Sequence, residues 1–378
     1  MRRYRTIVVG LGAMGSAAAA ALAQRGVEVL GVERLTPAHD RGSSHGDSRI
    51  VRMAYFEHPD YVPLLRRAYD GWAALERACG RQLITWTGAL MIGRPESTVV
   101  SGTLDSVRRW QLPHELLDVA AMADRFGQFR LRNDDVAVYE RHAGVVDPEA
   151  AVRTLHGQAT AHGAELRFET SIDGWRLRRD GVTVVVGGQD VVADHVVVGA
   201  GAWTAALVES TLPLTPVRTL TYHFVPDGDR SVFDPDHLPA FVWELMPGDA
   251  LYGAADVGRG APKVGFHHRR LPTDPDHLDR EASPQEVAAL RAVLAERIPA
   301  LAGGRVVTTA CMYTMTPDEH FVIGHLPGTA GRISIAAGFS GHGFKFVPVV
   351  GEILADLAID GGTDAPIALF DPTRFSAP

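Results

Sequence analysis

The sequence predicts an α/β fold in which a Rossmann-like dinucleotide-binding domain is interleaved with a second domain built on an antiparallel sheet. Three observations support this prediction. A glycine-rich turn follows a short β-branched run near the start of the chain. Apolar runs typical of buried strands return at residues 194–201 and 333–338, each followed by small residues. Residues 214–299 are rich in strand, turn and proline signals, which indicate an antiparallel sheet.

The opening unit places Gly10, Gly12 and Gly15 between the first apolar run and an alanine-rich helix. Gly10 permits a tight turn, Gly12 lets the backbone approach a pyrophosphate, and Gly15 lets helix and strand pack closely. The helix N-terminus offers free N–H groups to phosphates. Glu33 ends the next strand, where it can accept hydrogen bonds from ribose hydroxyls. The motif predicts a dinucleotide site, but by itself it does not separate FAD from NAD.

The expected elements divide the chain into two discontinuous domains. Asp147 and Pro148 open one helix, and Ser283 to Glu286 form the capping box of another. We expect the nucleotide-binding domain to comprise residues 1–82, 145–212 and 306–378, and the substrate domain residues 83–144 and 213–305. The active site should lie where the two domains meet.

Composition argues against several functional classes. The net charge of -8 over 378 residues argues against a nucleic-acid partner. The histidines show no spacing typical of a metal site, so no metal is expected. No apolar run reaches the roughly 20 residues that span a bilayer, so no membrane association is expected. Two cysteines cannot build a disulfide framework, which favours a reducing cytoplasm.

The N-terminus imitates a signal peptide, because Arg2, Arg3 and Arg5 precede an apolar, alanine-rich stretch. A signal peptide needs neither the spaced glycines nor the acid at Glu33, so we expect a cytoplasmic protein.

Cys311 is the most informative single residue. It stands in an Ala-Cys-Met-Tyr-Thr segment, and a second glycine-rich turn follows at residues 338–345. A lone thiol between two such turns suggests a flavin held by a covalent thioether.

Three segments are especially specific, namely residues 46–52, 311–321 and 338–346. Together with the opening unit they resemble the family of monomeric sarcosine oxidase and N-methyltryptophan oxidase, flavoproteins of the D-amino-acid oxidase superfamily. The resemblance covers nearly the whole chain. It implies a Rossmann-like FAD-binding domain, FAD attached through its 8α-methyl carbon to Cys311, and oxidation of a secondary α-amino acid. The amine is oxidised to an imine that hydrolyses, oxygen is reduced to hydrogen peroxide, and the enzyme is expected to be a monomer.

The resemblance also implies residue roles. The catalytic set is Lys263, His267, Arg49, Tyr252 and His342. The substrate-binding set is Arg52, Lys345, Tyr313 and Trp243. The cofactor-binding set is Gly10, Gly12, Gly15, Glu33, Arg34, Ser43, His45, Arg49, Gly201, Gly341, Gly343, Lys345 and the covalent ligand Cys311. Within these sets, Arg52 and Lys345 hold the substrate carboxylate, and Lys263 serves oxygen reduction.

Some alternatives remain open at this stage. Trp243 replaces a smaller apolar residue of the family and would either narrow the pocket or stack on a substrate ring. Sarcosine, N-methyltryptophan, pipecolate, proline and a cyclic imino acid of a biosynthetic pathway are all possible substrates. A nicotinamide-dependent dehydrogenase would be colourless when purified, and a non-catalytic flavin-binding module would produce no peroxide.

Overall fold

The opening βαβ unit forms as its glycine motif predicts. The computed structural model describes residues 2–208, 212–267 and 271–375. Strand β1 (Arg3–Val9) pairs in parallel with β2 (Val29–Val32), and helix α1 (Ala13–Gln24) connects them. A Cβ atom at Gly15 would lie 1.8 Å from the Gly10 carbonyl oxygen, so only glycine lets the helix start this close to the strand.

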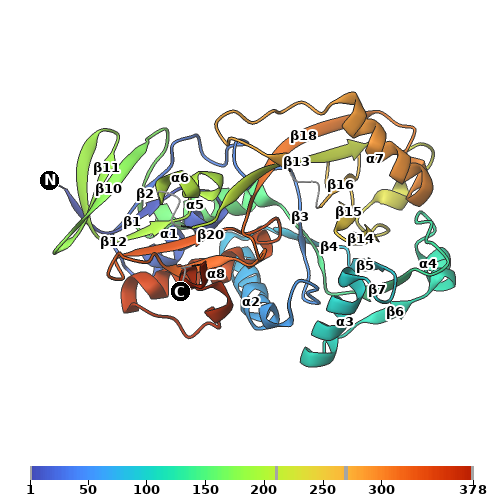
Figure 1. Ribbon diagram of the computed structural model, residues 1–378, viewed down its shortest axis with the longest axis horizontal. Coiled ribbons are helices and arrows are strands. Elements are labelled where there is room, and N and C mark those ends of the chain that lie inside the picture. Colours follow the sequence, from blue (N-terminus) through green and yellow to red (C-terminus); the bar gives the residue numbers. More distant parts are fainter. Residues whose placement is uncertain (1, 209–211, 268–270, 376–378) are drawn as a thin grey trace.

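Helix α1 is buried along nearly its whole length because alanine dominates it. It packs against α5 (Pro148–Ala161) and α8 (Val347–Asp360) on one side of the parallel sheet (Figure 1). A Cβ atom at Gly351 of α8 would lie 2.7 Å from Ala17, so small side chains set the distance between these helices. The Asp147 carboxylate accepts a hydrogen bond from the Ala150 N–H at 2.8 Å, which confirms the predicted N-cap of α5.

An eight-stranded sheet forms the left half of the molecule in Figure 1. Its order is β10-β11-β12-β1-β2-β9, with β20 paired to β12 and β19 paired to β20. Strands β9, β2, β1, β12 and β20 run parallel, so their carboxyl ends meet at one edge. The bounds are β9 (Glu165–Arg167), β10 (Ile172–Arg178), β11 (Gly181–Val186), β12 (Gln189–Val198), β19 (Val322–His325) and β20 (Ile333–Ala337).

A nine-stranded sheet forms the right half, in the order β17-β13-β16-β15-β14-β5-β7-β6, with β18 paired to β13. All of its pairs are antiparallel except β14 with β5. The bounds are β5 (Ala89–Gly93), β6 (Glu115–Leu117), β7 (Val136–Glu140), β13 (Thr215–Phe224), β14 (Ala240–Met246), β15 (Asp249–Ala254), β16 (Lys263–Phe266), β17 (Leu271–Pro272) and β18 (Val306–Met315). The α/β class with a Rossmann-like part and a mainly antiparallel part is confirmed.

Helices cover the second sheet, and a small sheet lies between the two large ones. Helix α7 (Pro284–Arg297) begins with the predicted capping box at Ser283. The three-stranded sheet has the order β3 (Arg49–Val51), β8 (Gly144–Val146) and β4 (Ile84–Trp86). The other α-helices are α2 (Val62–Cys79), α3 (Thr98–Trp110), α4 (Val119–Arg125) and α6 (Thr204–Leu207). The 3-10 turns are Pro59–Tyr61, Gly201–Trp203, Ser231–Phe233, Pro299–Leu301, Phe344–Phe346, Ala368–Phe370 and Pro372–Phe375.

Strand β18 differs from the expected domain division. Residues 306–378 are expected in the nucleotide-binding domain, yet β18 pairs with β13 along ten residues of the other sheet. Its partner lies about 90 residues earlier in the chain, and no local pattern reveals such a pairing. In the described ranges, no helix is both long and apolar enough to cross a membrane.

Buried histidines should make the fold sensitive to acid. His195 lies in β12 with its Nε2 2.8 Å from the Ser334 hydroxyl, and burial lowers its pKa to about 4. Because the unfolded chain binds a proton near the ordinary pKa of 6.5, stability is retained above that value and lost as the pH falls toward 4. His195→Gln keeps a polar partner for Ser334 without the titration. We expect the free energy of unfolding in urea to fall by roughly 2 kcal/mol less in this variant than in the wild type between pH 7 and pH 5. Equal losses in both proteins would contradict this assignment.

Candidate active site

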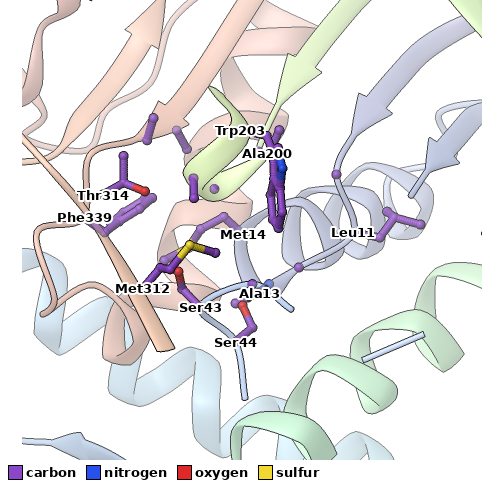
Figure 2. A pocket seen from close by; sticks show the side chains of 18 of the residues that line it. Leu11, Ala13, Met14, Ser43, Ser44, Ala200, Trp203, Met312, Thr314 and Phe339 are labelled. Atoms are coloured by element: carbon purple, nitrogen blue, oxygen red, sulfur yellow. Dashed lines mark hydrogen bonds between the residues drawn. The ribbon is translucent and has the colours of Figure 1, made fainter. Parts of the chain in front are cut away.

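The larger of two adjoining cavities, with a volume of about 400 Å³, lies at the carboxyl edge of the parallel strands (Figure 2). Nine of the predicted cofactor residues line it: Gly10, Gly12, Glu33, Arg34, Ser43, Arg49, Gly201, Gly341 and Gly343. Gly15 lies behind this surface, where α1 packs on β1. In Figure 2, Trp203 stands opposite Met312 and Ser43 across the opening. The volume falls in the range of sites for cofactors and other small molecules.

The glycine turn directs the N-terminal end of helix α1 toward this cavity. Gly10 has φ +86°, and a Cβ atom there would lie 2.8 Å from the Ala200 Cα, so the turn requires glycine. The Ser44 hydroxyl accepts a hydrogen bond from the Ala13 N–H at 3.0 Å. Ser44 was not predicted, although a serine beside Ser43 is the type of residue that caps a helix.

Glu33 is held ready to accept hydrogen bonds. Its carboxylate already accepts the Leu11 N–H at 2.9 Å and the Leu35 N–H at 3.0 Å, and His39 lies 3.6 Å away. Burial raises the pKa of Glu33, but His39 and the two N–H groups outweigh it and lower the pKa overall. The ionised carboxylate keeps free lone pairs, which fits the hydroxyls of a ribose.

At the wall of this cavity, Arg34 contacts Trp203 and Asp276, which come from distant segments of the chain. Its guanidinium stacks 4.9 Å from the Trp203 ring and donates to Asp276 at 2.5 Å. The indole N–H of Trp203 donates to the same carboxylate oxygen at 2.8 Å. Trp203 lies two residues after the predicted cofactor residue Gly201, whereas no local pattern identifies Asp276 as a lining residue.

The smaller cavity, of about 90 Å³, lies between the two large sheets. Eight of the predicted catalytic and substrate residues line it: Arg49, Arg52, Tyr252, Lys263, His267, Tyr313, His342 and Lys345. Arg49 and Tyr313 line both cavities, so the two spaces adjoin. Lys345 was also expected to contact the cofactor. It lines the smaller cavity and does not line the larger one.

Cys311 borders the smaller cavity from β18, where it is paired with Thr219 of β13. It is buried, and Arg49 Nη2 lies 3.7 Å from its Sγ. Burial raises the pKa of the thiol, but His45, Arg49 and Lys263 together lower it to about 6. A thiolate is therefore favoured at neutral pH, and the thiolate is the reactive form of cysteine. Cys79, by contrast, is exposed.

His45 lies beside the Cys311 thiol and is not among the lining residues of either cavity. Its Nε2 is buried without a hydrogen-bond partner of ordinary geometry in the described part of the chain, and its side chain lowers the pKa of the Cys311 thiol. Its carbonyl oxygen accepts a hydrogen bond from Arg49, which ties the two side chains to one loop.

Lys263 is held by the loop that carries His45. Its ammonium donates to the carbonyl oxygens of Gly46 at 2.9 Å and Ser48 at 2.7 Å. Burial, together with the charge of Arg49, lowers its pKa to about 7. A cation here faces the cavity from the substrate-domain strand β16.

The two cations expected to hold the substrate carboxylate, Arg52 and Lys345, lie beside an unpredicted acid, Glu57. Arg52 Nη2 donates to both carboxylate oxygens of Glu57, at 2.8 and 2.6 Å, and its Nη1 donates to the Ala54 carbonyl at 2.8 Å. Lys345 Nζ donates to the His342 carbonyl at 2.7 Å. Burial raises the pKa of Glu57, but Arg52, His342 and Lys345 lower it to about 2. The ionised form of a carboxylate is thus stabilised beside these cations, and a substrate carboxylate would bring the same negative charge.

Lysine usage was a sequence signal that could have strengthened this assignment. Lys263 and Lys345 are the only lysines in a chain whose Lys and Arg together number 37. Both are buried and both line the smaller cavity. Burial lowers the pKa of Lys345 to about 7, with the charge of Arg52 acting in the same direction.

Aromatic and imidazole groups complete the cavity wall. The His267 ring lies 5.8 Å from Tyr313 and 6.3 Å from Tyr252, measured between ring centroids. Burial raises the pKa of Tyr313 to about 12, so its phenol stays protonated. His342 Nδ1 lies 2.5 Å from the Tyr55 hydroxyl, and burial lowers the pKa of His342 to about 4, so its ring is neutral near pH 7.

Trp243 requires a correction. Its side chain is fully buried in the core under α7, where its indole N–H lies 3.3 Å from Asp135. Its neighbour Val242 lines the cavity instead, because successive side chains of β14 point to opposite faces. Trp243 therefore neither narrows the cavity nor stacks on a substrate.

Comparison with known proteins agrees with this geometry. Residues 5–357 match the family described as FAD dependent oxidoreductase. The chain belongs to this family. It is 45% identical to monomeric sarcosine oxidase of Streptomyces avermitilis, over 99% of this chain and 98% of that protein. It is 33% identical to N-methyl-L-tryptophan oxidase of Yersinia pestis, over 98% and 99% of the two chains.

A solved structure of NikD, an unusual amino acid oxidase essential for nikkomycin biosynthesis, superposes with a TM-score of 0.84 at 26% identity and covers 98% of each chain. As a member of this family of FAD-dependent oxidoreductases, the chain uses FAD, and the predicted class of oxidoreductase acting on CH–NH donors with oxygen as acceptor is confirmed. The larger cavity, with its glycine turn and Glu33, fits that cofactor.

Proposed function

We propose that this family member oxidises a small secondary α-amino acid of the sarcosine type. The observation that carries the proposal is the pair of buried cations, Arg52 and Lys345, in a cavity of about 90 Å³ that adjoins the cofactor cavity. Two cations can orient one carboxylate through charge-assisted hydrogen bonds. The similarity to monomeric sarcosine oxidase along nearly the whole chain supports the same substrate class.

The substrate carboxylate would compete with Glu57 for Arg52. Glu57 is held at 2.6 Å by Arg52, so the cation is already matched to a carboxylate in the protein alone. A second carboxylate entering the cavity gains Lys345 as an additional partner, whose ammonium now contacts only a carbonyl oxygen among the described hydrogen bonds. The contact with Lys345 therefore favours substrates that carry a carboxylate over simple amines, and it must outweigh the repulsion between that carboxylate and Glu57.

The amine must lose its proton before it can be oxidised. Arg52, Lys345, Arg49 and Lys263 place positive charge around the cavity, and positive neighbours lower the pKa of a bound ammonium. FAD held in the larger cavity would supply the hydride acceptor for the amine and the means to reduce oxygen. The residues of the chain hold the substrate over the cofactor, and this orientation is a large part of their contribution.

Cavity size favours small substrates. The apolar part of the wall consists of Ile50, Phe56, Val242, Ala254 and Phe344. They leave room for an N-methyl group or a small ring beside the carboxylate, whereas an indole would have to displace them. Sarcosine, proline and pipecolate are therefore the substrates to test first, with N-methyltryptophan as the large comparison.

We propose that Cys311 carries the flavin through a thioether to its 8α carbon. The lowered pKa of the thiol and the nearby Arg49 and His45 support this assignment. The new C–S bond replaces the thiol S–H and one methyl C–H, which releases two electrons and two protons. Oxygen, the acceptor of this enzyme class, takes them up.

We also infer that the enzyme acts as a monomer in a reducing cytoplasm, and that two discontinuous domains meet at the site. The name of the relative, monomeric sarcosine oxidase, supports the monomeric state. The exposed free thiol of Cys79 fits a reducing cytoplasm. The two large sheets support the domain division, with β18 shared between them.

Arg52→Ala tests the carboxylate assignment. Losing one charge-assisted contact costs about 1.5–3 kcal/mol, so the KM for sarcosine in a peroxide-coupled assay should rise roughly tenfold or more. The matched control is Arg218→Ala, because Arg218 is also buried but pairs with Glu286 outside both cavities. A normal KM in Arg52→Ala, or equal oxidation of an amine without a carboxylate, would refute the proposal.

A further inference from the structure

Glu140 is a buried carboxylate that belongs to neither cavity. It ends β7, and only 6% of its surface is exposed. Its Oε1 accepts the Met53 N–H at 2.8 Å, and its Oε2 accepts the Ala54 N–H at 2.8 Å. Met53 and Ala54 follow directly after Arg52, so a strand of the nine-stranded sheet holds the backbone of the segment that carries the cation.

These contacts continue to the Arg52 guanidinium. The N–H of Ala54 donates to Glu140, and the carbonyl oxygen of Ala54 accepts a hydrogen bond from Arg52 Nη1 at 2.8 Å. Arg52 Nη2 faces Glu57, and the Cζ atom of the guanidinium lies 4.4 Å from the centroid of the Tyr55 ring. The position of Arg52 in the cavity therefore depends on the turn that Glu140 holds.

Glu140 itself is fixed by its sheet. Its backbone is paired with Ala89 of β5, and Ala89 is in turn paired with Ala240 of β14, the strand that carries Val242 into the cavity wall. The carboxylate thus links the substrate wall to Arg52 through a continuous set of hydrogen-bonded strands.

The chemistry of the contact favours an acid. Two adjacent N–H groups are best matched by a group that only accepts hydrogen bonds, and the ionised carboxylate offers two such oxygens, of which Oε2 also accepts the Met53 N–H at 3.1 Å. A glutamine would turn an NH2 group toward one of these donors. Glutamine has the same shape as glutamate, but its NH2 group would face the N–H of Met53 or Ala54 and weaken that buried hydrogen bond.

Two groups face Glu140 from the surrounding elements. Arg52 lies on the segment after β3, and Tyr69 of α2 lies near it with its hydroxyl donating to the His142 carbonyl at 3.0 Å. Burial raises the pKa of Glu140 to about 7, while the N–H groups of Ala54 and Met53 and the charge of Arg52 act in the opposite direction. Part of the Glu140 carboxylate is therefore protonated in mildly acidic solution, and a protonated carboxyl group is a poorer hydrogen-bond acceptor.

We propose that Glu140 is a positioning residue for substrate recognition, which holds the Met53–Ala54 backbone so that Arg52 meets the substrate carboxylate. This inference rests on the proposed function of Arg52. Glu140, which lies outside the cavity, would then contribute part of the affinity for carboxylate ligands. It would have little effect on the rate of hydride transfer.

The test compares Glu140→Gln with Glu244→Gln in the holoenzyme. Glu244 is a matched control, since it is also 6% exposed and accepts a backbone N–H, that of Val99, at 2.9 Å. Propanoate serves as a carboxylate that has no amine to oxidise, and its Kd is read from the change in flavin absorbance. We expect this Kd to rise about 5- to 20-fold in Glu140→Gln and to stay within twofold in the control. The limiting rate of anaerobic flavin reduction by sarcosine should change less than threefold in either variant.

The pH profile separates positioning from general damage. The advantage of the wild type over Glu140→Gln in propanoate binding should shrink as the pH falls from 8 to 6, because the wild-type carboxyl then becomes protonated. If Glu140→Gln does not fold, Glu140→Asp is measured in the same way, because it keeps the charge but shortens the reach; we expect an increase in Kd there too.

Three results would overturn the inference: an unchanged Kd, a flat ratio across this pH range, or an equal loss of binding and reduction rate. If Arg52→Ala also binds propanoate normally, the proposed function itself fails. If Arg52→Ala loses binding while Glu140→Gln does not, only the role of Glu140 fails.

Discussion

Replacing Lys263 with methionine should leave flavin reduction near normal and slow reoxidation by oxygen by roughly 10²- to 10³-fold. Methionine keeps the length and apolar bulk of the side chain and removes only the charge. The first electron transferred to oxygen creates an anion in a poorly solvating cavity, and a nearby ammonium stabilises that anion. Hydride transfer from the amine does not create this charge, so it should be affected much less. Stopped-flow absorbance, first without oxygen and then after mixing with oxygen, measures the two half-reactions separately.

The other lysine provides the control. Lys345→Met removes a buried cation of the same type from the same cavity, but from the group proposed to bind the carboxylate. It should weaken substrate binding and leave reoxidation near normal. Equal slowing of both half-reactions in Lys263→Met would indicate a structural role for Lys263. An unchanged reoxidation rate would mean that Arg49 or Lys345 activates oxygen instead.

The reoxidation rate should also depend on pH in the wild type. Burial lowers the pKa of Lys263 to about 7, so the ammonium is present below that pH and is lost above it. The rate constant for reoxidation should therefore decrease as the pH rises through this region. The variant has no ammonium to lose, so its rate should lack this decrease.

Cys311→Ser should abolish covalent attachment of the flavin. In the wild type, yellow colour should remain with the polypeptide after acid precipitation, because a thioether survives unfolding. The intact mass should exceed that of the bare chain by one flavin. The denatured holoenzyme should also expose a single reactive thiol, since the chain has two free cysteines and only Cys79 would remain unmodified.

Cys79→Ser is the natural control for this experiment, because it removes the exposed thiol and should leave the colour attached. Cys311→Ser should release all of its colour into the supernatant. Colour in the supernatant of the wild type, or a wild-type mass equal to that of the bare chain, would refute the covalent assignment. Attachment should also slow when Arg49 or His45 is replaced, since both lower the pKa of the Cys311 thiol.

The nucleotide-binding unit was predictable because its determinants are local. Gly15 is required by a contact within one turn, Gly10 adopts the positive φ of that turn, and Glu33 directly follows the next strand. The N-caps at Asp147 and Ser283 are confirmed for the same reason, since a cap involves residues only three positions apart. Helix α3 was not predicted, although Ser97 accepts the Val100 N–H at 3.3 Å as its cap.

The cavity residues were predictable only through family resemblance, and the structure changes part of that picture. Eight of the nine residues in the catalytic and substrate sets line one cavity, while Trp243 points into the core. Phe241, Val242 and Trp243 are all apolar, so the sequence contains no alternation that would show which of them faces the cavity. The pairing of β14 with β5 and β15 decides this.

The sequence by itself determined the dinucleotide turn, the α/β class and the scarcity of lysine outside the site, because these depend on neighbouring residues and on composition. Tertiary structure alone decided that Glu140 holds the Arg52 segment from 87 residues away and that β18 joins the second sheet. Each of these contacts unites segments whose local sequences carry no sign of the partner. Their energies come from burial and charge, which exist only after the sheets have come together.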